Sequence, residues 1–512
     1  MTEKSNLPSQ LQRLPTGIAG LDALLKGGIF TGGHYLVMGV PGTGKTILGN
    51  QLCFEHVARG GRVLFVSLLT ETHSRLLTFL QSLTFFTPSP IGDALYYLSG
   101  SATLEREGLE GLLTLLRTET HRRRASLLLI DGTVMIEAPQ SRHGWLHFLH
   151  ALYASAEIQR CTTILLAQPS DTLIPEQTIA DGVIELTMAQ VGLRTVREVQ
   201  VHKHRGSSFL AGRHLSTITE TGLTVYPRTE ACLIAAPSAL PVAVSAPEPA
   251  GRMPLGIGRL DEMLQGGLPA GSTTLLLGAS GTGKTLLGSH FLVAGTKERH
   301  PGLYFGFSET PQQIARKLAR FGLDITHARA TGLLEVLWQS PVQDLLDVLA
   351  ERLFAAIEQI DARRLFIDGV GGFRRTVASV ERLDLFLIAL FAALQERGIT
   401  TICSVEMSNL FSPTVELPAV LDGAAAFADN LLFLRYVELE SQLYRLLSVM
   451  KMRESGYDSA IREFRITDQG IDVAATFASA QAILTGIAHL GTAPRGAIRD
   501  DYGRGSHPGE PA

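Results

Sequence analysis

The chain has 512 residues, too many for a single hydrophobic core, so we expect two or more domains. Its composition, 45% hydrophobic and 18% charged, is that of an ordinary globular protein. The formal net charge of −4 and a pI of about 6.4 argue against a protein that works on nucleic acid, and we expect no nucleic-acid role.

In chain order, the first informative motif is a phosphate-binding loop. Residues 16–28 predict a short helix ended by a Gly-Gly turn, and residues 34–38 predict an apolar strand. The next residues satisfy G-x-x-x-x-G-K-[ST] and open a helix; they read Gly39-Val40-Pro41-Gly42-Thr43-Gly44-Lys45-Thr46. Backbone N–H groups of such a P-loop cradle phosphate oxygens, its lysine reaches the β- and γ-phosphates, and its last hydroxyl ligates Mg²⁺. We therefore predict a nucleotide site here.

Two acidic residues follow strands of the first half. Glu71 comes after the apolar residues 63–68 and is a candidate for orienting an attacking water; the alternative is an acid that the macrodipole favours at a helix start. Asp131 ends the buried strand 127–131, where a Walker-B aspartate would hold Mg²⁺ or its water; the alternative is a turn aspartate. With a further strand at 162–167, strands alternate with helices, which implies a parallel sheet covered on both faces.

A pair of cations lies late in the first half. Lys203 and Arg205 are two residues apart at the end of a strand, so both point to the same face. Two cations on one face suit a γ-phosphate, including that of a neighbouring subunit, because the pair has no obvious use inside its own subunit. The alternative is a charged strand edge exposed to solvent.

Residues 228–252 predict an interdomain linker, because prolines 237, 241, 247 and 249 stand among small residues. We accordingly place a first domain at residues 1–227 and a second at 253–475. Residues 477–490 are apolar and compatible with a helix, which either packs on the second domain or serves as a regulatory docking segment. The region 476–512 is thus expected to hold a C-terminal helix and a disordered tail rich in Gly, Pro, Asp and Arg.

The second half repeats the first. Residues 255–267 repeat the helix and Gly-Gly turn, and residues 273–277 repeat the strand before the loop. The second P-loop reads Gly278-Ala279-Ser280-Gly281-Thr282-Gly283-Lys284-Thr285. The counterparts of Glu71, Asp131, Lys203 and Arg205 are Glu309, Asp368, Lys451 and Arg453. The fold class predicted is α/β, with two tandem P-loop domains, each a mostly parallel sheet flanked by helices.

The cellular compartment is indicated by what the sequence lacks. The four cysteines are scattered without a C-x-x-C pair, as expected of buried thiols in a reducing compartment. Residues 1–15 are polar and have no apolar signal core. The longest apolar run, residues 385–394, is too short to span a bilayer and predicts a buried helix. We therefore expect a cytoplasmic protein without a membrane partner.

From about Leu14 to Val473 the chain resembles the KaiC family of the RecA-like ATPase superfamily. The segments that carry the resemblance are Lys203-His204-Arg205-Gly206, Thr217-Ile218-Thr219, Gly-Phe-Ser-Glu-Thr-Pro at 306–311, Tyr436-Val437-Glu438, Lys451-Met452-Arg453 and Ala460-Ile461-Arg462-Glu463-Phe464. The resemblance implies two stacked RecA-like domains, a ring of six subunits, and ATP with Mg²⁺ bound between subunits. It also implies that both cation pairs reach into the neighbouring subunit's site.

The chain departs from the family pattern after the third strand of each half. The family commonly has paired glutamates there, whereas this chain has Thr70-Glu71 and Ser308-Glu309. Glu71 and Glu309 are therefore catalytic candidates without the usual neighbouring acid.

A second departure concerns regulation. Cyanobacterial members hydrolyse ATP slowly in the first domain and phosphorylate a Ser-Thr pair in the second. That pair lies four and three residues before an aspartate that opens a strand; counting back from Asp429 gives Ala425 and Ala426, which have no hydroxyl. We expect no autokinase activity at this place. The tail does not resemble the family segment that binds a clock activator, so a non-clock signalling ATPase fits better than an oscillator.

Three functions remain open from the sequence. The first is an oligomeric ATPase whose nucleotide state regulates an unidentified protein partner. The second is a DNA-acting recombinase or helicase of the RecA type, which the acidic pI and the lack of a basic loop disfavour. The third is a nucleotide-gated scaffold with little turnover, which the missing first glutamates favour.

Overall fold

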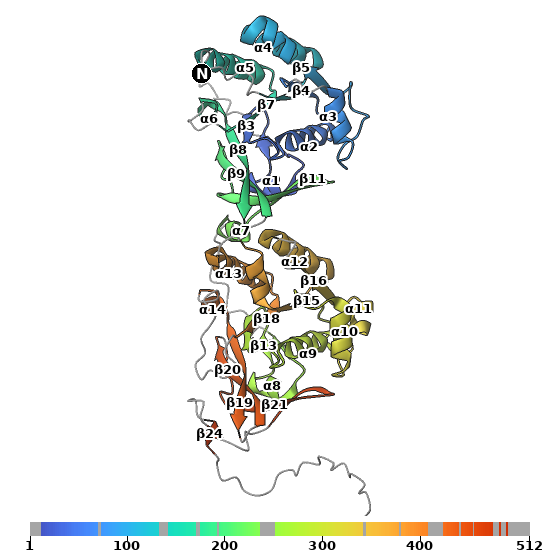
Figure 1. Ribbon diagram of the computed structural model, residues 1–512, viewed down its shortest axis with the longest axis vertical. Coiled ribbons are helices and arrows are strands. Elements are labelled where there is room, and N and C mark those ends of the chain that lie inside the picture. Colours follow the sequence, from blue (N-terminus) through green and yellow to red (C-terminus); the bar gives the residue numbers. More distant parts are fainter. Residues whose placement is uncertain are drawn as a thin grey trace, which may run out of the picture. The chain divides into compact units, whose positions relative to one another are not determined.

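The computed structural model describes residues 12–69, 73–132, 142–169, 175–191, 194–235, 251–340, 345–377, 380–407, 423–439, 442–453, 455–474, 481–482 and 488–489. The chain divides into two compact units, Met1–Ala243 with Leu345–Arg352, and Val244–Asp344 with Leu353–Ala512. Each unit is built around one nine-stranded sheet (Figure 1).

The sheet of the first unit is parallel over most of its width. Its strands are β3 (His34–Gly39), β4 (Val63–Ser67), β5 (Leu95–Ser99), β6 (Leu127–Asp131), β7 (Thr162–Ala167), β8 (Gly182–Val191), β9 (Arg194–His204), β10 (Arg213–Thr219) and β11 (Gly222–Tyr226). Their order across the sheet is β11-β10-β9-β8-β3-β7-β6-β4-β5. Pairs from β8 to β5 are parallel, and those from β11 to β8 are antiparallel.

Helices cover both faces of this sheet (Figure 1). Its helices are α1 (Ala19–Leu24), α2 (Lys45–Ala58), α3 (His73–Leu80), α4 (Ser101–Arg123), α5 (Arg142–Ile158), α6 (Pro175–Ile179) and α7 (Thr229–Ala235). Because side chains alternate along a strand, Leu129 of β6 packs with α1 and α2 while Leu128 packs with α4 and α5. Burial on both faces explains why the central strands are apolar throughout. The short strands β1 (Arg13–Leu14) and β2 (Ile29–Phe30) pair outside the sheet.

The second unit repeats this topology. Its sheet strands are β14 (Thr273–Gly278), β15 (Gly302–Gly306), β16 (Leu334–Trp338), β17 (Arg364–Asp368), β18 (Thr400–Glu406), β19 (Asn430–Leu439), β20 (Gln442–Met452), β21 (Arg462–Thr467) and β22 (Gly470–Val473). The order is β16-β15-β17-β18-β14-β19-β20-β21-β22, the same as in the first unit read from the other edge. A second outlying pair joins β12 (Arg252–Met253) to β13 (Leu268–Pro269).

The helices of the second unit follow the same plan. They are α8 (Gly258–Met263), α9 (Lys284–Lys297), α10 (Pro311–Ala319), α11 (Ile325–Ala330), α12 (Leu346–Ile360), η2 (Val370–Arg375), α13 (Val380–Glu396) and α14 (Ala424–Phe427). Of α12, the residues up to Arg352 group with the first unit and the rest with the second. The predicted fold class is therefore confirmed, and the apolar run at 385–394 lies within α13 as expected. Nowhere in the described residues is there a helix that meets the length and apolarity of a membrane span.

The chain passes from one compact unit to the other at Ala243/Val244, inside the predicted linker 228–252. The first part of that segment is helix α7, which was not expected; Thr229–Ala235 contains no proline and has Glu230 in the first turn, where the helix macrodipole favours an acid. The predicted C-terminal helix at 477–490 is replaced, among the residues described there, by strands β23 (Gln481–Ala482) and β24 (Ala488–His489), which pair antiparallel. Gly486 lies inside that segment, and a glycine in a helix interior costs about 1 kcal/mol.

Candidate functional site

Each P-loop connects a central parallel strand to a long helix: β3 to α2 in the first unit, β14 to α9 in the second. Gly42 and Gly44 have φ angles of 83° and 104°, and Gly281 and Gly283 have 79° and 108°. These left-handed angles suit glycine, which lacks the Cβ that makes them costly. A Cβ on Gly44 would also lie 2.7 Å from the Ile218 side chain. The loop thus leaves the first N–H groups of the helix open to an anion.

The other predicted loop residues are fixed by close packing. A Cβ on Gly39 or Gly278 would lie 2.6 Å from a carbonyl oxygen of the neighbouring strand. The Thr43 hydroxyl donates to the Val40 carbonyl at 2.9 Å, and the Thr282 hydroxyl makes the same bond to Ala279 at 2.8 Å. Pro41 and Ser280 line the cavities beside the two loops.

The structure brings the last residue of each loop to the aspartate predicted as its partner. Thr46 Oγ1 donates to Asp131 Oδ2 at 2.9 Å, and Thr285 Oγ1 donates to Asp368 Oδ2 at 2.9 Å. The parallel sheet explains this meeting, because the carboxyl ends of its strands lie at one edge. A hydroxyl and a carboxylate side by side are oxygen ligands of the kind that Mg²⁺ binds, so this donor set fits the metal.

The loop lysines lie folded over their own loops. Lys45 Nζ donates to the carbonyl oxygens of Gly39 and Val40, and Lys284 Nζ donates to those of Gly278 and Ala279. Burial lowers the pKa of Lys45, and the charge of Asp131 opposes this shift. The ammonium groups of both lysines thus donate to backbone carbonyl oxygens, and a bound phosphate would need the same donors.

A cavity lies beside each loop, and the two differ in lining. The first has a volume of about 660 Å³ and the second about 350 Å³, within the range of small-molecule sites. Beyond the loop and the aspartate, the first is lined by Gln168 and Arg197. The second is lined by Glu309, Glu406 and Lys317. The repeat therefore encloses two chemically different sites.

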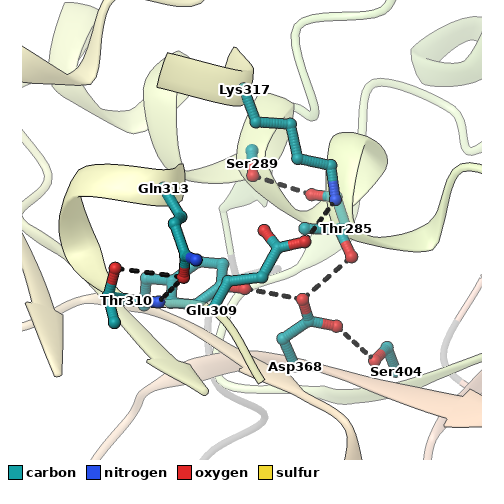
Figure 2. A network of polar contacts seen from close by, with 9 residues as sticks. Thr285, Ser289, Glu309, Thr310, Gln313, Lys317, Asp368 and Ser404 are labelled. Atoms are coloured by element: carbon teal, nitrogen blue, oxygen red, sulfur yellow. Dashed lines mark hydrogen bonds and ion pairs between the residues drawn. The ribbon is translucent and has the colours of Figure 1, made fainter. Parts of the chain in front are cut away.

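Glu309 lies in the second cavity, as predicted, next to a lysine. Its Oε1 accepts from Lys317 Nζ of α10 at 2.8 Å (Figure 2). Among the described residues, its buried Oε2 has no hydrogen-bond partner. A capping box between Thr310 and Gln313 fixes the start of α10 directly after Glu309. Glu71, the counterpart in the first unit, lies outside the described residues.

The cation pairs do have partners in their own chain, which corrects the expectation that they have no use there. Lys203 Nζ donates to the carbonyls of Gln177 and Thr178 at 3.1 and 2.9 Å, at the end of α6. Lys451 Nζ donates to Ala428 at 2.7 Å, after the end of α14. The last carbonyls of a helix lack intrahelical donors, so nearby cations satisfy them.

The arginines of the two pairs act alongside these lysines. Arg205 donates to the Thr178 carbonyl at 3.3 Å, and Arg453 donates to that of Ala426. Their side chains remain 57% and 49% exposed. Neither pair lines the cavity of its own unit, so a contact with a neighbour's nucleotide stays a prediction.

Several site residues were missed from the sequence. Tyr304, Ser404 and Glu406 lie beside Asp368 or Lys284, and Gln168 and Arg197 line the first cavity. These residues lie on, or directly after, strands that are distant from the P-loop in sequence and reach the site only through the order of strands in the sheet. No local sequence motif therefore marks them. Burial, and after it the nearby Asp368, raises the pKa of Tyr304, so its phenol stays a donor. Burial lowers the pKa of Lys284, while the charges of Glu406 and Asp368 oppose this shift.

Two P-loops, each with a threonine–aspartate pair at the carboxyl edge of a mostly parallel sheet, define a tandem P-loop ATPase of RecA-like fold. The family described as "ATPase: KaiC" matches residues 14–230 and 253–477. The chain therefore belongs to the KaiC family of ATPases.

Characterised relatives align over nearly the whole chain. It is 27% identical over 494 residues to the circadian clock oscillator protein KaiC 1 of Synechocystis sp., covering 93% of this chain and 92% of the relative. It is 26% identical over 499 residues to the circadian clock oscillator protein KaiC of Prochlorococcus marinus, covering 94% and 96%. The protein of that name from Synechococcus elongatus is 25% identical over 491 residues, covering 93% and 92%.

The loop lysines generate a prediction for binding. Lys45→Ala should weaken nucleotide binding at the first site only, and Lys284→Ala at the second only. A charge-assisted hydrogen bond contributes about 1.5–3 kcal/mol, which corresponds to about 10- to 150-fold in Kd. Titration with a fluorescent ATP analogue measures both sites, and Lys297→Ala, at the far end of α9, is the control. Single variants that bind like the parent would show that the loops are not the nucleotide sites.

Proposed function

We propose that this chain binds ATP with Mg²⁺ at both P-loops, hydrolyses it slowly, and signals to a protein partner through its nucleotide state. The observation that carries the proposal is the threonine–aspartate pair, 2.9 Å apart in both units, beside a glycine-rich loop and a cavity. Membership of an ATPase family supports the same reaction.

The residues of each site divide the work of phosphoryl transfer. The loop N–H groups hold the phosphates, and the loop lysine leaves its carbonyl partners to donate to the β- and γ-phosphates. Thr46 and Asp131 would hold Mg²⁺ in the first site, and Thr285 and Asp368 in the second. The bound ion neutralises the charge that develops on the phosphates.

Glu309 is the residue we propose to orient the attacking water at the second site. Its Oε2 accepts no hydrogen bond from the described residues, and a water would satisfy that buried oxygen. Lys317 donates to the other oxygen and orients the carboxylate. We propose the same role for Glu71 at the first site from the repeat alone.

Assembly is the third part of the proposal. We propose a cytoplasmic ring of six subunits, in which Lys203, Arg205, Lys451 and Arg453 reach the nucleotide of the neighbouring subunit. The exposure of the two arginine side chains supports this role, although Arg205 also pairs with Asp181 at 3.5 Å and Arg453 with Asp429 at 4.0 Å. We also propose that the chain is not a clock oscillator, although relatives carry that name.

Hydrolysis gives the first test. Glu71→Gln together with Glu309→Gln should lower ATP turnover by about 10²–10⁴-fold, because a positioned carboxylate contributes about that much. Phosphate release measures the rate, and nucleotide binding should be unchanged. The control is Glu335→Gln, an acid 44% exposed in its pair with Arg329. A parent without turnover would favour the nucleotide-gated scaffold instead.

Assembly gives the second test. Light scattering should report a monomer or small species without nucleotide and a ring with Mg²⁺ and ATP. Arg205→Ala with Arg453→Ala should reduce ring formation, because each of the neighbour's two nucleotide sites would lose one of the two cations proposed to reach it. Arg363→Ala, 50% exposed, is the control. A chain that stays monomeric under both conditions contradicts this part of the proposal.

Regulation gives the third test. Phosphoryl transfer needs a hydroxyl in line with the γ-phosphate, and Ala425 and Ala426 offer none. Intact-mass spectrometry after long incubation with Mg²⁺ and ATP should therefore find no phosphate on the peptide spanning residues 408–430. An adduct on that peptide would restore the clock-like interpretation.

A further inference from the structure

The carboxylate of Asp368 is held by three hydroxyl groups. Thr285 Oγ1 and the Tyr304 phenol both donate to Oδ2, at 2.9 and 2.6 Å. Ser404 Oγ donates to Oδ1 at 2.8 Å. Figure 2 shows Asp368 between Thr285 and Ser404, with bonds to both of its oxygens. Two of these donors lie outside the P-loop, on the strands that flank β17.

Both of those donors are fixed by their surroundings. Tyr304 is 3% exposed, and its ring packs edge-on against Phe366 at 5.4 Å. Ser404 is 2% exposed, and its oxygen accepts the Gly369 N–H at 2.8 Å, which directs the hydroxyl hydrogen to Asp368. Both oxygens of the Asp368 carboxylate therefore accept hydrogen bonds from buried side chains whose orientation is fixed by their neighbours.

The first unit lacks the phenol at the equivalent position. Tyr304 lies opposite Phe366, two residues before Asp368, in the pairing of β15 with β17. In the pairing of β4 with β6, Phe65 lies opposite Leu129 at the same distance from the strand end. Phenylalanine has the ring without the hydroxyl.

The serine is also replaced. Cys403 lies opposite Ile367, which places Ser404 level with the end of β17. In the first unit Leu166 lies opposite Asp131 at that position. The side chains that brace the second aspartate therefore have apolar counterparts beside the first.

We propose that Tyr304 and Ser404 are positioning residues that fix the Asp368 carboxylate for a divalent cation and so strengthen Mg²⁺ binding at the second site. This inference rests on the proposed binding of Mg²⁺ and ATP at both P-loops. If the Thr285 hydroxyl left Asp368 to bind the ion, the two other donors would still hold the carboxylate. Groups that hydrogen-bond a metal-ligating side chain typically contribute 10- to 100-fold to metal affinity.

The test uses the full chain with Lys45→Ala, at nucleotide concentrations that fill the second site and leave the weakened first site largely empty. The measurement is the Mg²⁺ concentration that half-saturates binding of a fluorescent ATP analogue, with Mn²⁺ electron paramagnetic resonance as a second readout. Tyr304→Phe, which copies the first unit's residue, should raise this concentration by about 10-fold or more. Ser404→Ala should raise it as well. Nucleotide binding in the absence of the metal should be unchanged.

Two controls separate positioning from a general loss of structure. Tyr457→Phe removes a phenol of the same unit that bonds the Met450 carbonyl at 3.3 Å, and it should leave the Mg²⁺ dependence unchanged. With Lys284→Ala in place of Lys45→Ala, Tyr304→Phe should have no effect on the first site.

The outcomes are distinct. An unchanged Mg²⁺ dependence in both Tyr304→Phe and Ser404→Ala overturns the inference while the proposed function stands. Weaker nucleotide binding without any metal overturns it too, because the hydroxyls would then serve the fold of the site. If Tyr304→Phe does not fold, Ser404→Ala decides alone. A parent with Lys45→Ala that binds no nucleotide removes the proposed function and the inference with it.

Discussion

The structure depends on an aspartate placed at the end of a buried parallel strand. A carboxylate that is largely withdrawn from water is costly unless hydrogen bonds satisfy it. Asp131, 6% exposed, accepts a hydrogen bond from the threonine that ends its P-loop, and Asp368 accepts from the corresponding threonine and from Tyr304 and Ser404. Because parallel strands end at one edge of the sheet, the P-loop, its lysine and the first turn of the helix that follows lie at the same edge as the aspartate. An anion site with a place for a cation follows from that arrangement.

The two units share the sheet order and the conformation of the P-loop but differ in the side chains around the loop. The sheet order is the same in both units, and the loop angles agree within a few degrees. The first site has Phe65 and Gln168 where the second has Tyr304 and Glu406. Among the described residues, Glu309, Glu406 and Lys317 line the second cavity, whereas Gln168 and Arg197 line the first.

The sequence predicted the parts of the site that local spacing encodes. Both P-loops, the strands before them and the aspartates were predictable, since glycine spacing and a strand-end acid are short-range patterns. Tyr304 and Ser404 were not, because they meet Asp368 only through the crossover order of the sheet. Composition placed the linker where the chain passes between the two units, but it did not predict helix α7 or the strands β23 and β24.

For the cation pairs, the sequence predicted the shared face but not the groups that the side chains bind. Alternation along a strand indicated a shared face for Lys203 and Arg205, but it did not indicate the helix end that both bond. In the proposed ring, these side chains would have to bind a neighbour's phosphate in addition to the helix-end carbonyls that they bond within the chain.

The central claim is that this one chain contains two nucleotide sites. Equilibrium dialysis of the full-length protein against radiolabelled ATP with Mg²⁺, at saturating concentrations, measures the number of nucleotides bound per chain. The account predicts two bound nucleotides per chain. A stoichiometry of one or none at saturation would contradict it.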